Sequence, residues 1–543
     1  MLDPSVYEDG FARDHLPPEN LWPEMTEALG AFGYPKRINA AVELLDAMVE
    51  KGFGARPCIR ASDGTVWNYA DLRDHANRIA NLLVTEMGLR PGNRVLLRSA
   101  NNRMLVACWF AVLKAGGIVV TTMPLLRSRE LAYIVDKAQV SLALCDASLA
   151  QEIEAAREGV SALRSIAYFN TTAPTGIEMR MQRQSPHFTD IVPSHDDVAL
   201  IAFTSGTTGK AKATVHFHRD VLAICDGYAR NILNPTSDDI FCGSPPLAFT
   251  FGLGGLLLFP LRVGASTLLL EKCTATILLQ AIQDHRVTAL FTAPTMYRAM
   301  SEHAAAFDLK SLRLCVSAGE HLPAPVQQAW RDATGITLLN GIGSTEMLHI
   351  FVSTRVGDAL HGATGYAVPG YSAMVVDDEM RPVPANTVGR LAVRGPTGCR
   401  YLADPDRQKD YVKDGWNLTG DAFRLDENGI FWYHTRTDDM IVSSGYNISG
   451  PEIEGVLLEH PKVREAVVVG VPDAGRGQIV KAFIVLKEAS TDQLQTAKEL
   501  QDFVKAQIAP YKYPREIVFV DDLPRTETGK VQRFRLRQDQ NAP

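Results

Sequence analysis

Short apolar runs of strand length alternate with segments of helical spacing through most of the chain. The runs 94–97 and 118–122 each follow a glycine-containing turn, and a helical pattern from Leu105 to Lys114 lies between them. A further amphipathic helix is predicted behind Asp71, which we expect to cap it. This alternation predicts an α/β fold in which a large, multi-layer N-terminal domain contains doubly wound sheets.

The part of the chain beyond about residue 439 has an α+β pattern. Beyond this point helices and strands follow without regular alternation, with helices expected at 451–459 and 491–508 and strands at 466–471, 481–487 and 516–520. This order predicts a small α+β C-terminal domain. Residues up to about Asn39 are rich in Pro, Glu and Trp, and we expect them to wrap the surface as an arm.

Composition narrows the classes of protein. The 543 residues include 55 basic and 62 acidic ones, a net charge of −7 that favours neither nucleic acid nor a membrane surface as partner. The longest apolar stretch, about 251–261, contains glycines and a proline and is too short to cross a bilayer. Eight cysteines are scattered singly with no metal-binding spacing, and the N-terminus has no secretory pattern, so we expect reduced thiols in a cytoplasmic protein.

The most informative stretch is 204–212, Thr-Ser-Gly-Thr-Thr-Gly-Lys-Ala-Lys, which directly follows the apolar run 198–203. Its two glycines, its hydroxyl side chains and Lys210 form an array of donors suited to phosphate oxygens. A polar hairpin turn with a solvated lysine is the alternative. The stretch is not a Walker A loop, because only two residues separate its glycines and Ala211 stands where that motif needs a hydroxyl.

Six further segments also contain small, aromatic or charged residues that a binding site could use. They are Pro245–Gly254 with Phe249, the strand-and-turn 314–320, the run 340–351, the aspartate of 416–421, the arginine of 435–441, and 523–530 with its lysine. Taken singly, each has an ordinary explanation: an aromatic core segment, a bare turn, or a charged surface residue. Only when they are taken together, in this order along the chain, do they indicate a function.

Together these segments closely resemble the adenylate-forming superfamily, in which acyl- and aryl-CoA ligases share the phosphate loop T-S-G-T-T-G-x-P-K. The resemblance covers nearly all of the chain beyond the first forty or so residues. It implies that ATP and AMP are bound by Thr204, Ser205, Gly206, Thr207, Thr208, Gly209, Lys210, Ala318, Gly319, Glu320, Ile342, Ser344, Thr345, Asp421 and Arg436. It further implies Mg²⁺ near Glu346, a catalytic Lys530 and a CoA contact at Gly445. It also implies a hinge at Asp438, which divides the chain into a large domain (1–437) and a small one (438–543).

Three departures from the family pattern are visible: Ala211 for proline, Ile342 for the tyrosine that stacks on adenine, and Thr528 for serine. The run 340–351 looks like that of benzoate- and aminobenzoate-CoA ligases, and 16–23 is more similar to 2-aminobenzoate-CoA ligases. By this resemblance the acyl pocket is lined by Phe249, Thr250, Phe251, Ala318, Gly343, His349 and Ile350. His349 is either a structural histidine or a polar edge beside a ring substituent.

The resemblance therefore implies an enzyme that joins a small aromatic acid to CoA through an acyl-adenylate, with ATP and Mg²⁺. The expected partners are the acid, ATP and CoA, with 2-aminobenzoate preferred over benzoate and the oligomeric state open. One alternative is a stand-alone adenylation enzyme that loads a separate carrier protein. A non-enzymatic nucleotide sensor is the other, and retention of Lys530 and of the phosphate loop speaks against it.

Overall fold

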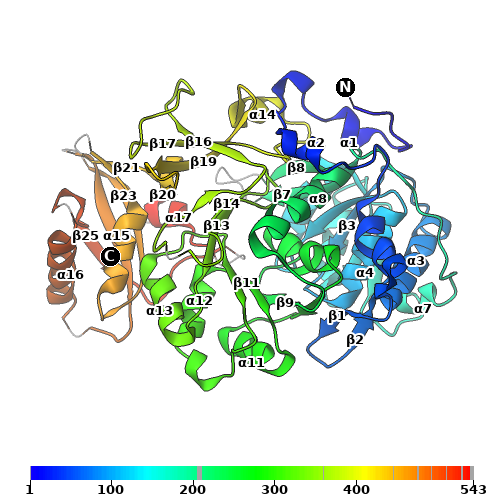
Figure 1. Ribbon diagram of the computed structural model, residues 1–543, viewed down its shortest axis with the longest axis horizontal. Coiled ribbons are helices and arrows are strands. Elements are labelled where there is room, and N and C mark those ends of the chain that lie inside the picture. The colour runs from blue at the N-terminus through cyan, green and yellow to red at the C-terminus, as the bar shows by residue number, and fades with distance from the viewer. Residues whose placement is uncertain are drawn as a thin grey trace.

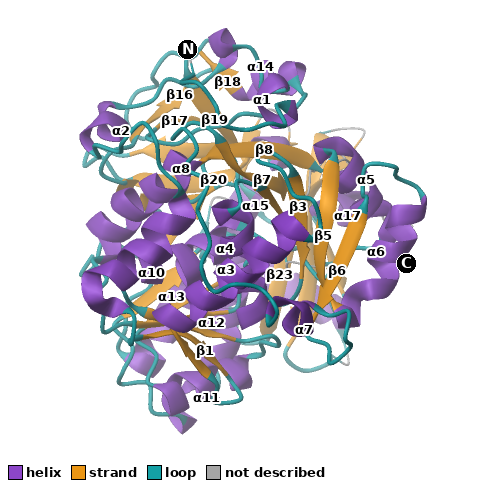
Figure 2. Ribbon diagram, turned by 90° about the vertical axis from the view of Figure 1, so that its right-hand side faces the viewer, coloured by secondary structure: helices purple, strands orange, loops and turns teal. Residues whose placement is uncertain are grey.

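The computed structural model of the protein describes residues 2–204, 211–358, 360–443, 446–473, 476–490, 492–508, 510–526 and 530–538. Figure 1 shows the chain building a large body first and a smaller C-terminal body at one end, on the left of the view. Figure 2 shows the helices covering and separating the sheets. These layers confirm the predicted α/β class with a small α+β part.

The largest sheet has a parallel centre and antiparallel edges. In spatial order its strands are β15 (Tyr366–Ala367), β14 (Ile350–Ser353), β13 (Leu339–Gly343), β12 (Leu314–Ser317), β11 (Ala289–Thr292), β9 (Ile240–Gly243), β10 (Ser266–Leu269), β1 (Pro57–Ala61) and β2 (Val66–Asn68). Strands β1, β10, β9, β11, β12 and β13 pair in parallel, whereas β14, β15 and β2 join antiparallel. The carboxyl ends of the parallel strands thus share one edge.

A second sheet has the same construction. Its strands, in order, are β6 (Ser165–Phe169), β5 (Val140–Asp146), β3 (Arg94–Arg98), β4 (Ile118–Thr122), β7 (Val198–Thr204) and β8 (Lys212–Phe217). All neighbours are parallel except β7 and β8, which form an antiparallel hairpin. Helix α4 (Arg103–Lys114) is buried along its length and shares one apolar core with residues of both sheets.

Helix α3 (Tyr69–Thr85) corrects one expectation. Its N-cap is Asn68, not Asp71: the Asn68 side chain accepts from the Asp71 N–H at 2.7 Å, and the Asp71 carboxylate accepts from the Asn68 N–H at 2.9 Å. This reciprocal pair is a capping box, in which the acidic residue belongs at the third helical position.

The remaining helices of the large body lie around these sheets. They are α1 (Phe11–Asp14), α2 (Glu27–Ala31), α5 (Ser128–Ala138), α6 (Ala150–Glu158), α7 (Ile177–Met181), α8 (His218–Ile224), α9 (Thr250–Leu253), α10 (Phe259–Arg262), α11 (Ala275–His285), α12 (Pro294–Ser301), α13 (Ala324–Thr334) and α14 (Pro405–Tyr411). No helix in the described part of the chain combines the length and apolar content that a bilayer crossing needs.

An antiparallel sheet completes the large body. Its strands are β16 (Ser372–Val376), β17 (Val388–Arg394), β18 (Val412–Lys413), β19 (Trp416–Leu425) and β20 (Phe431–Arg436). The N-terminal arm joins it to the second sheet. Tyr7 donates to the Val198 carbonyl at 3.0 Å, Arg13 pairs with Asp197 at 3.1 Å, and Met25 forms a β-bridge with Gly395.

The C-terminal body has its own sheet, which has a core on each face. The elements are β21 (Ile441–Ser443), β22 (Tyr446–Ile448), α15 (Gly450–Glu459), β23 (Val463–Asp473), β24 (Gly477–Leu486), α16 (Gln493–Gln507), β25 (Glu516–Phe519) and α17 (Arg533–Gln538). One core packs under α15 and α16, and the other includes Leu523 and Leu536 near the end of the chain. The short helix η8 (Thr437–Asp439) connects this body to β20.

Candidate active site

The predicted phosphate loop connects β7 to β8. Strand β7 ends at Thr204, whose backbone pairs with Lys212 across the hairpin. Ser205, Gly206, Thr207, Thr208, Gly209 and Lys210 lie outside the described residues, as does the predicted CoA contact Gly445. The strands on either side of the loop are well packed, since β7 is buried from Val198 to Ala202.

The turn after β12 supplies three of the predicted residues. Ala318 is buried, whereas Gly319 has φ +90° and nothing within 4 Å of the position that a Cβ would occupy. A glycine is favoured here by the backbone angle, and it leaves open space at the strand end. Glu320 follows with its carboxylate facing Arg525 and Lys530 of the small body; desolvation raises its pKa, and the two cations oppose the rise.

The segment after β13 carries the densest group of predicted residues. Ile342, Ser344 and Thr345 are partly exposed, but Glu346 is buried, and its Oε1 accepts a hydrogen bond from the Tyr401 hydroxyl at 2.7 Å. Two residues further on, the buried Leu348 has φ +68°. A bulky side chain in this region is a strained conformation of the kind that clusters at functional sites.

The predicted acyl residues combine an aromatic wall with a buried histidine. Phe251 is partly exposed, and its ring centroid lies 5.8 Å from Phe291 and 5.7 Å from His349. His349 also packs edge-on against Phe259 at 4.6 Å. Burial lowers the pKa of His349 to about 3, so the ring is neutral at neutral pH.

The other acyl residues surround this wall in different ways. Phe249 and Gly343 keep exposed surface, whereas Thr250 and Ile350 are buried. A Cβ on Gly343 would come within 2.6 Å of the His349 carbonyl oxygen, so the backbones of β13 and of the segment before β14 approach closely.

Asp421 and Arg436 are cross-strand neighbours on β19 and β20. The Asp421 carboxylate accepts from the Arg436 guanidinium at 3.1 Å, which also donates to the Thr419 carbonyl at 3.2 Å. Asp421 is buried and Arg436 half-exposed. The pair stands at the end of the last sheet of the large body, one residue before η8.

Lys530 belongs to the small body and lies at its boundary with the large body. Its N–H donates to the Thr526 hydroxyl at 3.1 Å, and its carbonyl accepts from the Thr526 N–H at 2.6 Å, which closes a tight turn. Lys530 keeps accessible surface, yet the atoms crowded around its ammonium lower its pKa by desolvation. Three carboxylates oppose that shift, and all belong to the large body: Glu320, Asp421 and Glu346. The structure thus brings Lys530 together with four predicted residues, these three and Arg436.

Sequence reasoning missed the groups that hold Glu346 in place. Tyr401 donates to its carboxylate, and the His216 Nε2–H donates to the neighbouring Thr345 carbonyl at 2.8 Å. Beneath them Arg400 and Asp220 form a fully buried ion pair at 3.2 Å. A tyrosine and an arginine between strands carry no periodic signal, so only the fold reveals them.

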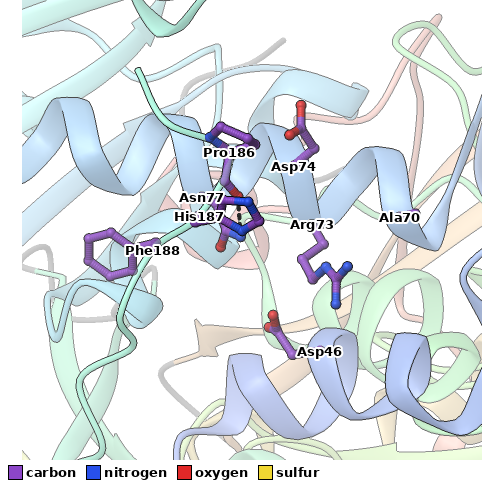
Figure 3. Close-up of a pocket in the computed structure, with 8 residues that line it drawn as sticks. All are labelled: Asp46, Ala70, Arg73, Asp74, Asn77, Pro186, His187 and Phe188. Carbon is purple, nitrogen blue, oxygen red and sulfur yellow. Dashed lines mark hydrogen bonds between the residues drawn. The ribbon is translucent and has the colours of Figure 1, made fainter.

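A separate groove lies far from these residues, at the end of the molecule away from the small body. It has a volume of about 400 Å³ and is lined by Asp46, Ala70, Arg73, Asp74, Asn77, Pro186, His187 and Phe188, as Figure 3 shows. None of these residues belongs to the predicted site. Most of the predicted site residues that the structure describes lie instead in or after β12 and β13, within β19 and at the end of β20, and in the C-terminal body at Lys530.

The chain is similar to known proteins over most of its length. Models of the AMP-binding enzyme family and of the AMP-binding enzyme C-terminal domain match residues 47–401 and 452–530. A benzoate–CoA ligase of Thauera aromatica is 33% identical over 512 residues, which cover 93% of this chain and 97% of the relative.

Two solved structures are similar over almost the whole chain. The anthranilate CoA ligase AuaEII, solved in complex with anthranoyl-AMP, has a TM-score of 0.89 at 32% identity and covers 94% of this chain and 98% of its own. A benzoate CoA ligase from Burkholderia xenovorans LB400 has a TM-score of 0.85 at 33% identity, covering 92% and 100%.

The two family models together cover most of the chain, and the relatives match it over nearly its whole length. This chain belongs to the AMP-binding enzyme family, as its motifs predict.

Proposed function

We propose that this enzyme is an acid–thiol ligase of the aryl-CoA branch. It joins a small aromatic carboxylate to CoA through an acyl-adenylate and releases AMP and pyrophosphate. The observation that carries the proposal is the placement of Lys530 among Glu320, Asp421 and Glu346 of the large body. The names of the similar proteins, benzoate– and anthranilate–CoA ligases, support the class of acid.

In the first half-reaction the carboxylate attacks the α-phosphorus in line and pyrophosphate leaves. Lys530 then neutralises charge between the attacking carboxylate and the α-phosphate, and loop 204–210 holds the outer phosphates. Asp421 accepts hydrogen bonds from the ribose hydroxyls, a task that suits a carboxylate. Such a reaction depends mostly on positioning and on charge stabilisation.

A magnesium ion fits the donors that are present. Mg²⁺ is usually held by one or two carboxylates together with substrate phosphates, and Glu346 is a buried carboxylate kept in orientation by Tyr401. No group of three or more metal-binding side chains occurs among the described residues, in keeping with an ion held mainly through ATP. When bound, the ion offsets the charge of the triphosphate.

In the second half-reaction the domain 438–543 rotates about Asp438. Lys530 withdraws, and the face that carries Gly445 admits the thiol of CoA, so one site serves both steps. A carrier-protein thiol is the alternative acceptor. Pyrophosphate release, measured with the acid and ATP and with or without CoA, tests the activity and the acceptor. Turnover that ignores CoA but responds to a thiolated carrier would favour the alternative.

The preferred acid is predicted to be 2-aminobenzoate, with benzoate weaker or equal and fatty acids inactive. The preference rests on the pocket that the resemblance implies, in which Phe249, Phe251 and Ile350 would form the walls beside Ala318 and Gly343 and leave room for one planar ring. A small ring substituent shifts discrimination by only about 1–3 kcal/mol in an apolar pocket, so the two acids are expected to overlap.

This preference is checked by kcat/KM for 2-aminobenzoate, benzoate, 4-hydroxybenzoate, cinnamate and octanoate. Octanoate or cinnamate as the best substrate would refute the small-ring pocket. Benzoate far above 2-aminobenzoate would refute only the finer assignment.

Tyr401→Phe should lower kcat/KM for ATP roughly tenfold while the protein stays folded. The phenylalanine ring fills the same space, but one oxygen of the buried Glu346 loses its donor, which costs about 1–3 kcal/mol. Steady-state kinetics at several Mg²⁺ concentrations measure the effect. An unchanged ATP and Mg²⁺ dependence would show that Tyr401 does not orient Glu346.

A further inference from the structure

Near Lys530, a series of ion-paired side chains connects the large body to the small one. Arg298, on α12, pairs with Glu465 Oε1 at 3.0 Å, and its other terminal nitrogen donates to the Arg464 carbonyl. The second oxygen of Glu465 pairs with Arg525. A single carboxylate of the small body therefore holds one arginine from each body.

Arg525 belongs to the same turn as Lys530. Its backbone forms an antiparallel bridge with Val531, the residue that follows Lys530. Fixing the Arg525 side chain therefore fixes the base of the turn from which Lys530 projects. Glu465 is well placed to do this, because it lies near the start of the rigid strand β23.

Helix α12 provides the contact surface on the large body. Its first turn contains Thr295, which hydrogen-bonds to Glu320, the carboxylate that faces both Arg525 and Lys530. Arg298 lies three residues further along the same helix face. The cations Arg298, Arg525 and Lys530 thus alternate with the carboxylates Glu465 and Glu320 across the interface.

The pairs are only partly exposed: the side chains of Arg298, Glu465 and Arg525 keep 24%, 17% and 24% of their surface. Ion pairs that are partly desolvated and form a network are worth more than isolated surface pairs. When the small body rotates, Glu465 keeps Arg525 but must leave Arg298, because only Arg298 belongs to the large body.

We propose that Arg298 and Glu465 are positioning residues that select the adenylate-forming arrangement. Glu465 holds Arg525, whose backbone is bridged to Val531, and binds α12 through Arg298; together these contacts set Lys530 among the carboxylates of the large body. This proposal deepens the proposed function and rests on it for its two half-reactions.

The test compares the two half-reactions in Arg298→Gln, Arg298→Lys, Glu465→Gln and the double variant Arg298→Gln/Glu465→Gln. Adenylation is followed by pyrophosphate release without CoA, and thioester formation is followed from synthetic 2-aminobenzoyl-adenylate and CoA. Arg298→Gln should slow adenylation about tenfold, the loss of some 1.4 kcal/mol, and leave thioester formation unchanged or faster. Arg298→Lys should restore much of the loss.

A matched control is Arg78→Gln on α3, an ion-paired arginine of similar exposure at the other end of the molecule, which should change neither step. Equal loss in both half-reactions of Arg298→Gln, or no loss in either, would overturn the proposal. The double variant separates a specific pair from a general need for a cation. If Arg298 acts through Glu465, Arg298→Gln should cost little more once Glu465→Gln is present, and a fully additive loss would contradict the pair.

A distance measurement keeps this result apart from failure of the proposed function. Spin labels at the exposed Leu494 on α16 and Ile277 on α11 report the separation of the two bodies without any substrate. Arg298→Gln should broaden the distance distribution, and an unchanged distribution would overturn the bridge. A wild-type enzyme inactive on every aromatic acid would instead refute the function while leaving the distance result valid.

Discussion

Lys530→Ala is expected to abolish adenylate formation and to leave thioester formation from preformed acyl-adenylate largely intact. In the arrangement described, the Lys530 ammonium is the cation that the small body presents to Glu320, Asp421 and Glu346. Removing one preorganised charge-stabilising group costs about 10²–10³ in rate, and a full cation between two anions should cost at least that much. In the proposed mechanism the second half-reaction does not use this group.

Two further variants make the result specific. Lys530→Arg keeps the charge but spreads it over a larger planar group, so it should recover only part of the adenylation rate. Lys462→Ala removes a lysine of the same domain that pairs with Glu499, and both half-reactions should stay normal. If Lys530→Ala slowed both half-reactions equally, its assigned role would be wrong.

Asp438→Pro is expected to have the opposite effect to Lys530→Ala. Adenylate should form and accumulate, whereas thioester formation should be impaired. Asp438 lies within η8, the short 3-10 helix between β20 and β21. Proline fixes φ near −65°, within the range of a 3-10 helix, so the arrangement described is permitted and rotation about that bond is blocked. Rapid quenching with and without CoA measures the adenylate.

The control for the hinge is Asp438→Ala, which removes the carboxylate without fixing the backbone. It should turn over far more like the wild type than the proline variant does. Proline also disfavours a helical conformation at Thr437, so a modest loss of adenylation rate is expected in Asp438→Pro. Normal overall turnover of Asp438→Pro would remove Asp438 from the hinge role.

The fold could be predicted because its signals are local. Turns rich in glycine and apolar runs of strand length locate β3, β4 and β7 to within a residue or two. The cap of α3 was misassigned because Asn68 and Asp71 are both good capping residues, and only the geometry distinguishes the cap from the third helical position.

The site was predictable only through motifs in order. Lys530 alone is an ordinary lysine in a tail, and nothing near it in sequence says that it meets Glu320 and Asp421. Tyr401, His216 and the Arg400–Asp220 pair could not be found, because their roles depend on contacts between residues more than fifty positions apart. The role of each site residue, the domain boundary and the choice of acid stay predictions.

The N-terminal arm also constrains the order in which the chain can assemble during its synthesis. Thr26 donates to the Gly370 carbonyl at 2.7 Å, Met25 bridges to Gly395, and the Glu24 N–H donates to the Gly415 carbonyl at 2.9 Å. A ribosome must therefore extend the chain past residue 415 before these contacts can form, and contacts so distant in sequence close slowly. The residues that emerge first are among the last to reach their final place, and until then the edge of the β16–β19 sheet that they cover stays open to chaperones.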